Sequence, residues 1–199
     1  MSAKSTDHPL ERLVFFSDAV FAIVITLLVI EIHIPTLSPA ATTAEAWHEF
    51  AALTPSLFAF VLSFLVIGRF WIGHHKLFSH VSRFDERLLW PNLLLLLVVA
   101  FMPFATGFLG RNLGQFVPAL IYNLTMLASA LLNLSLLRIV TKCDLLDVDA
   151  HQQFLWRPIG VALAALTCVG LAFLSPEFSQ VGMGTIPLWQ RLTKWWISK

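Results

Sequence analysis

Polar side chains interrupt the first long apolar segment of the sequence. Ser17 and Asp18 stand next to each other, and Thr26 follows about two turns later. An ionised carboxylate near the centre of a membrane-spanning helix costs roughly 2.5 to 3.5 kcal/mol, and such side chains normally face protein or water. We therefore expect Asp18 to face a cavity connected to water or a hydrogen-bonding partner within a helical bundle.

Two histidines offer partners for this carboxylate. His74 and His75 stand at the end of the second apolar segment, and imidazole or indole N–H groups can donate to a buried carboxylate. Acids and histidines within membrane helices form proton relays, and histidine titrates near neutral pH. One hypothesis is therefore a proton-coupled secondary transporter or a proton-permeable channel that uses Asp18 with His74 or His75.

The same residue types could also form a metal site or a hydrolase. A metal site would use His74, His75 and His80, but adjacent residues on a helix point about 100° apart. An enzyme would need a clustered nucleophile, base and orienting group, and the neighbouring side chains of Ser17 and Asp18 diverge for the same reason. We predict neither a metal site nor an enzyme.

The elements that position these residues are apolar segments long enough to cross a membrane. The 199 residues are 57% hydrophobic and only 13% charged, whereas soluble domains carry about 25% charged residues. At about 20 residues per crossing, the sequence predicts an all-α integral membrane protein with one transmembrane domain over residues 1–199. Its six predicted spans are Leu13–Ile34, Phe50–Gly73, Leu88–Leu109, Phe116–Val140, Pro158–Leu174 and Phe178–Trp196. The last of these spans is the weakest, because two glycines and a proline interrupt it.

Basic residues indicate the orientation of these spans, because Lys and Arg collect in short cytoplasmic loops. With six crossings, Arg111 is the one basic residue of 13 that lies outside, where we expect a solvated loop charge. Both termini are then predicted to be cytoplasmic, and Thr36–Glu49 an outer surface loop. The net charge of +1 does not predict a basic face for nucleic acid, so partners are expected in the membrane.

One face of the first span is apolar apart from a hydroxyl group. On a period of 3.6 residues, Ala19, Ile23, Thr26 and Ile30 share this face, with Leu27 at its margin. Copies of the helix around a central axis would form aliphatic rings and one hydroxyl ring, a constriction that can gate by dewetting. The same period is more often that of lipid-facing or core side chains, so periodicity alone does not establish a pore.

The first span also carries a longer pattern, with further motifs in the second and third spans. These patterns are Arg12-x-x-x-Phe16-Ser17-Asp18 with the apolar run that follows it, Trp71-x-x-His74-His75-x-x-Phe78, and Asn92 with Phe101-x-Pro103-Phe104. Together they resemble the signature of the transmembrane protein 175 family of potassium channels, in its short prokaryotic six-helix form. The resemblance covers roughly the first half of the chain.

The resemblance implies an assembly and an activity. It implies a homotetramer in which the first helices line a central pore, and a potassium-selective leak channel that needs no cofactor beyond its permeant potassium ions. The family lacks the TVGYG filter, and no such string occurs here. By position, Ile23 becomes the bottleneck of a hydrophobic constriction, and Thr26, Leu27 and Ile30 form the next pore-facing layers. Gating by an arginine ladder is not expected, since no span carries spaced arginines.

The resemblance also implies a structural latch at the inner end of the first helix. The prokaryote-like length and the absence of a recognisable targeting signal lead us to expect a prokaryotic plasma membrane. The latch packs the first helix against neighbouring helices. Its candidate residues are Arg12, Phe16, Ser17, Asp18, Trp71, His74 and His75. Spacing leaves open which histidine, if either, pairs with Asp18.

Overall fold

Long apolar segments form helices because a helix satisfies its backbone N–H and C=O groups internally, which lipid cannot do. The computed structural model describes residues 8–146 and 156–197. The α-helices are α1 (His8–Leu27), α2 (Thr43–Ala52), α3 (Thr54–Phe78), α4 (Leu89–Arg111), α5 (Phe116–Lys142), α7 (Trp156–Leu174) and α8 (Ile186–Ile197). Short 3₁₀ helices extend or connect them: η1 (Leu28–Glu31), η2 (Glu86–Leu88) and η3 (Pro176–Thr185).

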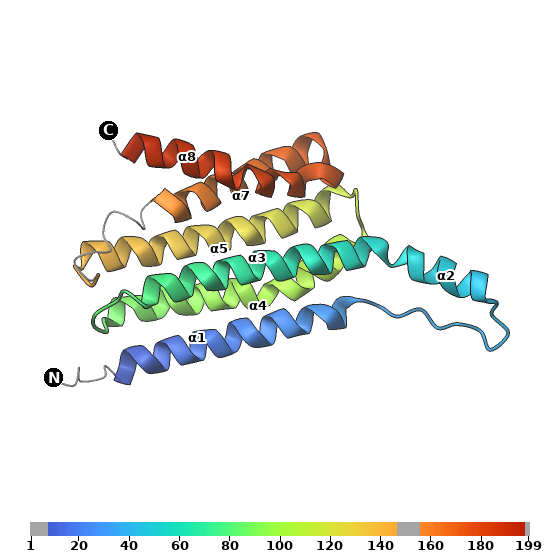
Figure 1. Ribbon diagram of the computed structural model, residues 1–199, viewed down its shortest axis with the longest axis horizontal. Helices are drawn as coiled ribbons and strands as arrows, with labels where there is room; N and C mark the ends of the chain where they lie inside the picture. Colours follow the sequence, from blue (N-terminus) through green and yellow to red (C-terminus); the bar gives the residue numbers. More distant parts are fainter. Residues whose placement is uncertain (1–7, 147–155, 198–199) are drawn as a thin grey trace.

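The helices form a bundle in which α1 and α8 lie at opposite edges (Figure 1). Helix α1 packs on α3 and α4, α4 packs on α3 and α5, and α5 packs on α7, which η3 and α8 cover. The first turn of α1 and the last turn of α8 lie at the same end of the bundle (Figure 1). One side of α1 therefore contacts the bundle, while the other side is turned away from it.

Within residues 8–146 and 156–197, five helical segments are long and apolar enough to cross a membrane, so the protein is an all-helical integral membrane protein. They are His8–Glu31, Thr54–Phe78, Glu86–Arg111, Phe116–Lys142 and Arg157–Leu174. The first five predicted spans coincide with these helices to within five residues at each end; the largest differences are that α1 begins five residues before the predicted Leu13 and α3 ends five residues after the predicted Gly73. The sequence does not predict the first turn of α1, because Glu11 and Arg12 are charged and do not extend an apolar run.

The sixth predicted span, Phe178–Trp196, is not one continuous α-helix. Its first part belongs to the 3₁₀ helix η3, and its second part is the 12-residue α8. A Cβ on Gly182 would lie 2.8 Å from Cys168 Sγ and 3.0 Å from Cys168 N, so this glycine lets η3 lie directly against α7. Close backbone approach at small residues is typical of helix packing in membranes. A complete sixth crossing remains a prediction.

The predicted outer loop Thr36–Glu49 contains a helix that sequence reasoning missed. Helix α2 begins with a capping box, in which Thr42 accepts from the Glu45 backbone N–H and the Glu45 carboxylate accepts from the Thr42 backbone N–H. The spacing of Thr and Glu was the available signal for this helix start. The Thr42 contacts also hold the pKa of the Glu45 carboxyl below its ordinary value.

Buried hydroxyl and amide groups connect the central helices. Thr106 of α4 donates to Ser63 of α3 across 2.8 Å, and Ser63 lies 3.0 Å from the hydroxyl of Tyr122 in α5. On the other side of α5, Asn123 donates to the Cys168 carbonyl and to Ser179. Interhelical hydrogen bonds of this kind fix helix positions where the surrounding lipid gives no hydrophobic drive for association.

Candidate functional site

Helix α1 has one face buried in the bundle and one face exposed. The buried residues recur at intervals of three and four and are Leu13, Ser17, Phe21, Val24 and Leu28. This spacing is that of a single helical stripe, and it packs on α3 and α4. The residues predicted to face a pore lie on the opposite side of α1.

The exposed side of α1 and of the 3₁₀ helix η1 that continues it carries the predicted constriction residues, with Ile30 in η1. Ile23 is 57% exposed, Leu27 41% and Ile30 68%, and Thr26 is exposed between them. Helical spacing brings Ile23, Thr26 and Ile30 into one line along the outside of the bundle. The structure therefore places the four residues together on a surface that one chain leaves uncovered.

The hydroxyl group of Thr26 is held by its own helix. Its Oγ1–H donates to the Ile23 carbonyl across 2.8 Å. A hydroxyl has one donor and two acceptor lone pairs, so the group turns its acceptor side away from the backbone. An acceptor in this position suits a cation rather than an anion.

In the N-terminal half of α1, Asp18 is bonded to an indole rather than to an imidazole. Trp71 of α3 donates its Nε1–H to Asp18 Oδ1 across 2.9 Å. His75 stacks on the Trp71 ring, with ring centroids 5.6 Å apart. The structure thus brings Asp18 and Trp71 together, and His75 contacts the ring of Trp71.

His74 belongs to a second, fully buried contact. Its Nε2–H donates to Asn92 Oδ1 across 2.9 Å, and Asn92 Nδ2–H donates to Ser17 Oγ across 2.9 Å. Ser17 in turn donates to the Leu13 carbonyl. Asn92 was absent from the predicted latch, although a lone amide in an apolar helix is itself a signal for an interhelical bond.

Two predicted latch residues lie apart from this network. Arg12 and Phe16 are exposed and line a groove with Phe84 and Leu89 at the end of the bundle where α1 begins. Their spacing from Asp18 places them on the outer side of α1, whereas Ser17 faces inward. Of the predicted latch residues, Ser17, Asp18, Trp71 and His74 therefore form interhelical hydrogen bonds, with Asn92 as a further partner and His75 stacked on Trp71.

At the outer end, Arg111 is not the solvated loop charge that was expected. Its Nη2–H donates to Glu31 Oε2 across 2.9 Å, and its Nε–H donates to the Gly107 carbonyl. The pair joins the end of η1 to the end of α4. The two residues are 80 positions apart, so no local pattern in the sequence could predict the contact.

Metal ligands do not gather anywhere in residues 8–146 and 156–197: this part of the chain has no group of three or more His, Cys, Asp or Glu side chains that could hold a metal ion. His74, His75 and His80 occupy different surroundings. His74 lies buried between Phe21 and Phe78, His75 stacks on Trp71, and His80 contacts Ser79.

In the part of the chain that the structure describes, the fold is that of an all-helical integral membrane protein, with five helical segments long and apolar enough to cross a membrane. The family described as endosomal/lysosomal potassium channel TMEM175 matches residues 12–103. A protein of Streptomyces collinus named as a potassium channel is 40% identical over 188 residues, which are 89% of each chain. The present chain belongs to the TMEM175 family.

Solved and animal relatives extend this comparison. The crystal structure of a lysosomal potassium-selective channel TMEM175 homolog from Chamaesiphon minutus is 32% identical, with a TM-score of 0.74 over 94% of this chain and 98% of the other. The mouse protein named as the endosomal/lysosomal proton channel TMEM175 is 33% identical over 100 residues, 48% of this chain and 20% of the relative. The similarity to the bacterial proteins thus covers nearly the whole chain.

Proposed function

We propose that this protein is a potassium-selective leak channel in which four copies of α1 line a central pore. Membership of the TMEM175 family supports the activity, since its Streptomyces relative is named as a potassium channel. Passive conduction needs no catalytic group and no cofactor. The orientation that follows from the basic residues puts both termini in the cytoplasm of a bacterial cell, with the pore across its plasma membrane.

The observation that carries the proposal is the exposed stripe of Ile23, Thr26, Leu27 and Ile30 on α1. A single helix cannot enclose a pore, whereas cyclic symmetry repeats one face of it as a ring. Four such faces give aliphatic rings at Ile23, Leu27 and Ile30. The latch on the opposite face of α1 keeps the stripe aligned with the axis.

The proposed rings act on the hydration of the ion. Aliphatic side chains offer no ligands to an ion. When the narrow pore at the Ile23 ring holds no water, it is closed to ions, and this dewetting is the proposed gate. The Thr26 hydroxyls, one turn further along, present acceptor lone pairs to an ion that has lost part of its shell. Selectivity in this proposal comes from ring width and hydration energy together with the Thr26 acceptors.

The test is single-channel recording of purified, reconstituted protein under a potassium/sodium gradient. Wild type should give unitary steps that reverse toward the potassium equilibrium potential. Ile23→Asn wets the constriction, so it should raise the open probability and lower the selectivity for potassium. Mass photometry or cross-linking of the same sample should give a tetramer.

The matched control is Leu166→Asn on α7, which puts the same polar group on another exposed apolar side chain, 53% exposed. Helix α7 lies across the bundle from α1 (Figure 1). Leu166→Asn should conduct as wild type does. Equal effects of the two substitutions, or unchanged currents in Ile23→Asn, would remove Ile23 from the pore.

Proton permeation is a second candidate, because the mouse relative is named as a proton channel. In this structure Asp18 accepts a hydrogen bond from an indole N–H. The indole nitrogen can only donate a hydrogen bond, so it cannot take up a proton from Asp18 and pass it on. We therefore expect potassium flux to exceed proton flux. A flux assay under a pH gradient, on wild type and Asp18→Asn, distinguishes the two candidates. If Asp18 relays protons, the variant should lose its proton flux and keep its potassium flux.

A further inference from the structure

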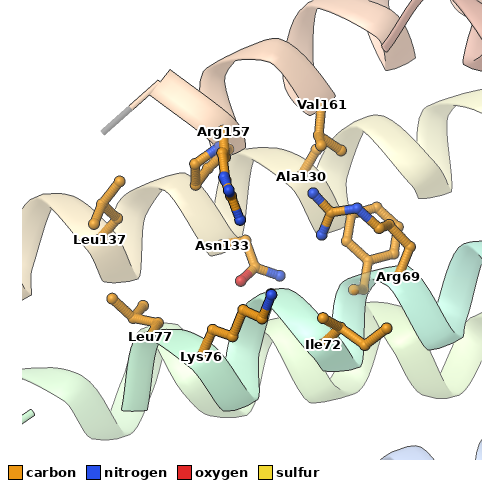
Figure 2. A pocket seen from close by; sticks show the side chains of 12 residues that line it. Arg69, Ile72, Lys76, Leu77, Ala130, Asn133, Leu137, Arg157 and Val161 are labelled. Carbon is orange, nitrogen blue, oxygen red and sulfur yellow. The ribbon is translucent and has the colours of Figure 1, made fainter. Parts of the chain in front are cut away.

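A cavity of about 240 Å³ lies between α3, α5 and α7, away from the exposed stripe of α1 (Figure 2). Its lining combines basic, amide and apolar side chains. Figure 2 shows the nitrogen-bearing ends of Arg69, Lys76 and Arg157 turned toward the amide of Asn133. None of these residues belongs to the proposed pore, so ion conduction along α1 does not explain the cavity.

The charge of the lining is of one sign. Three of its twelve residues are basic, and none is acidic. Among the described residues, neither Arg69 nor Lys76 forms an ion pair. Positive groups of neighbouring helices repel one another inside a bundle, and this repulsion is relieved when an anion lies between them.

Asn133 adds a polar group that points to the same kind of ligand. Its Nδ2 is buried, and it has no hydrogen-bond partner among the described residues. Unpaired buried amide groups cost free energy, and most are satisfied in native proteins. The basic side chains and this amide are all donors, so the cavity suits a ligand that offers several acceptor oxygens, as a phosphate does.

The cavity lies in the half of the bundle where α3 and α5 end and α7 begins. Lys76 stands two residues before the end of α3, and Arg157 is the second residue of α7. Arg69 and Asn133 each stand nine residues before the ends of α3 and α5, which is about 14 Å along a helix. All four therefore lie at one end of the bundle, with long side chains that can reach toward the interface.

The remaining lining is apolar and continues to the lipid-facing surface. Ile72 is 41% exposed on α3. The other apolar side chains come from all three helices and are Phe70, Leu77, Ala130, Leu137, Pro158 and Val161. A free inorganic anion gains nothing from contact with these apolar side chains. The acyl chain of a phospholipid buries apolar surface against them, which is favourable.

We propose that this cavity binds the headgroup phosphate of an anionic phospholipid, with Arg69, Lys76 and Asn133 as its donors and the apolar wall beside its acyl chain. Basic pockets between membrane helices on the cytoplasmic side are suited to such headgroups. The site is separate from the α1 stripe, and the proposal holds whether or not the protein conducts potassium. A bound lipid here holds α3, α5 and α7 together.

The test is native mass spectrometry of the full-length protein in detergent, titrated with dioleoylphosphatidylglycerol or with dioleoylphosphatidylcholine. Wild type should bind phosphatidylglycerol more tightly than phosphatidylcholine. Each basic side chain contributes about fivefold near an anionic lipid surface, so Arg69→Gln/Lys76→Gln should weaken phosphatidylglycerol binding by about 25-fold. The single variants, each expected at about fivefold, replace the double variant if it does not fold by circular dichroism and gel filtration.

The control is Arg138→Gln, which removes an exposed basic residue of α5 outside the cavity lining. It should leave the affinity for phosphatidylglycerol unchanged. Equal affinity of wild type for the two lipids, or an equal loss in Arg138→Gln, would overturn the proposal. Competition by soluble glycerol phosphate at the same concentration as the lipid would overturn it as well, because the site would then recognise a free anion.

Discussion

The indole N–H of Trp71 donates to the carboxylate of Asp18 across 2.9 Å, and this bond ties α3 to the inner end of α1. Helix α1 is the edge helix of the bundle (Figure 1). Its exposed stripe can serve as a pore wall only if its rotation about its own axis is fixed. Asp18 and Ser17 fix it through two different neighbours, α3 and α4.

Replacing Trp71 should therefore harm α1 more than neutralising Asp18 does. Trp71→Phe keeps an aromatic ring but removes the donor from the half-buried carboxylate of Asp18, and a hydrogen bond to a charged group contributes up to about 1.5–3 kcal/mol. Asp18→Asn keeps an oxygen that accepts from the indole, so its cost should be smaller. Thermal unfolding in detergent, followed by gel filtration after heating, measures both. The opposite order of midpoints would mean that the carboxylate charge, rather than the bond to Trp71, stabilises α1.

Asn92 should be the most sensitive single residue of the latch. Asn92→Ala leaves the Nε2–H of His74 without an acceptor and the Ser17 hydroxyl without its donor. All three side chains are fully buried, so water cannot replace the lost bonds. We expect a loss of about 2 kcal/mol in stability. Ser17→Ala removes the acceptor for Asn92 and the donor to the Leu13 carbonyl, but it leaves the bond between His74 and Asn92 in place and should cost about 1 kcal/mol.

A double-mutant cycle checks the Asn92 contact directly. If the amide acts on α1 through Ser17, then Ser17→Ala should cost little in the Asn92→Ala background, because the bond between them is already lost. Additive effects in the same unfolding assay would contradict the observed contact. Leu97→Ala, which truncates an exposed residue of α4, is the control and should change stability least.

The sequence predicts the membrane spans well and the latch only in part. Apolar runs of about 20 residues determine helices in lipid without reference to any partner, and α1, α3, α4 and α5 follow them. The sequence predicts that Asp18 needs a hydrogen-bond donor, but it does not identify that donor as Trp71 rather than a histidine. Asn92 could not be assigned to His74 rather than to Asp18, since that choice depends on the rotation of α4 against α3.

Two other features lay beyond the sequence for physical reasons. The pair of Glu31 and Arg111 joins residues 80 positions apart, and only the packing of α1 on α4 brings them together. The basic cavity draws Arg69, Asn133 and Arg157 from three helices. Positive residues at one end of a membrane protein predict orientation, but they do not reveal which of them converge.

At the outer end, Gly107 should be required for the pair of Glu31 and Arg111. A Cβ on this residue would collide with the Glu31 carboxylate and would lie 3.1 Å from Arg111 Nη2. Gly107→Ala should therefore displace the pair. The pair is partly exposed, with side chains 30% and 46% accessible, so its own contribution is about 1 kcal/mol or less.

The coupling between these positions is the measurable consequence. Arg111→Gln should lower the unfolding midpoint of wild type slightly and should have no further effect in the Gly107→Ala background. Thermal unfolding at low and high salt gives a second readout, because salt screens an exposed pair. If Arg111→Gln lowers the unfolding midpoint of Gly107→Ala as much as it lowers that of wild type, the pair does not depend on Gly107 and the prediction is wrong.

Thr26 should contribute to ion selection through its oxygen rather than its shape. Thr26→Val preserves the branched side chain but removes the acceptor that the bond to the Ile23 carbonyl leaves available. If that oxygen contacts a partly dehydrated ion, the potassium-to-sodium permeability ratio should fall about threefold, which corresponds to under 1 kcal/mol. Thr26→Ser keeps the hydroxyl and should retain most of the ratio. Reversal potentials under bi-ionic conditions measure the three proteins side by side. A ratio that falls in Thr26→Ser as much as in Thr26→Val would assign the effect to packing of the methyl group, and the hydroxyl would then have no part in selection.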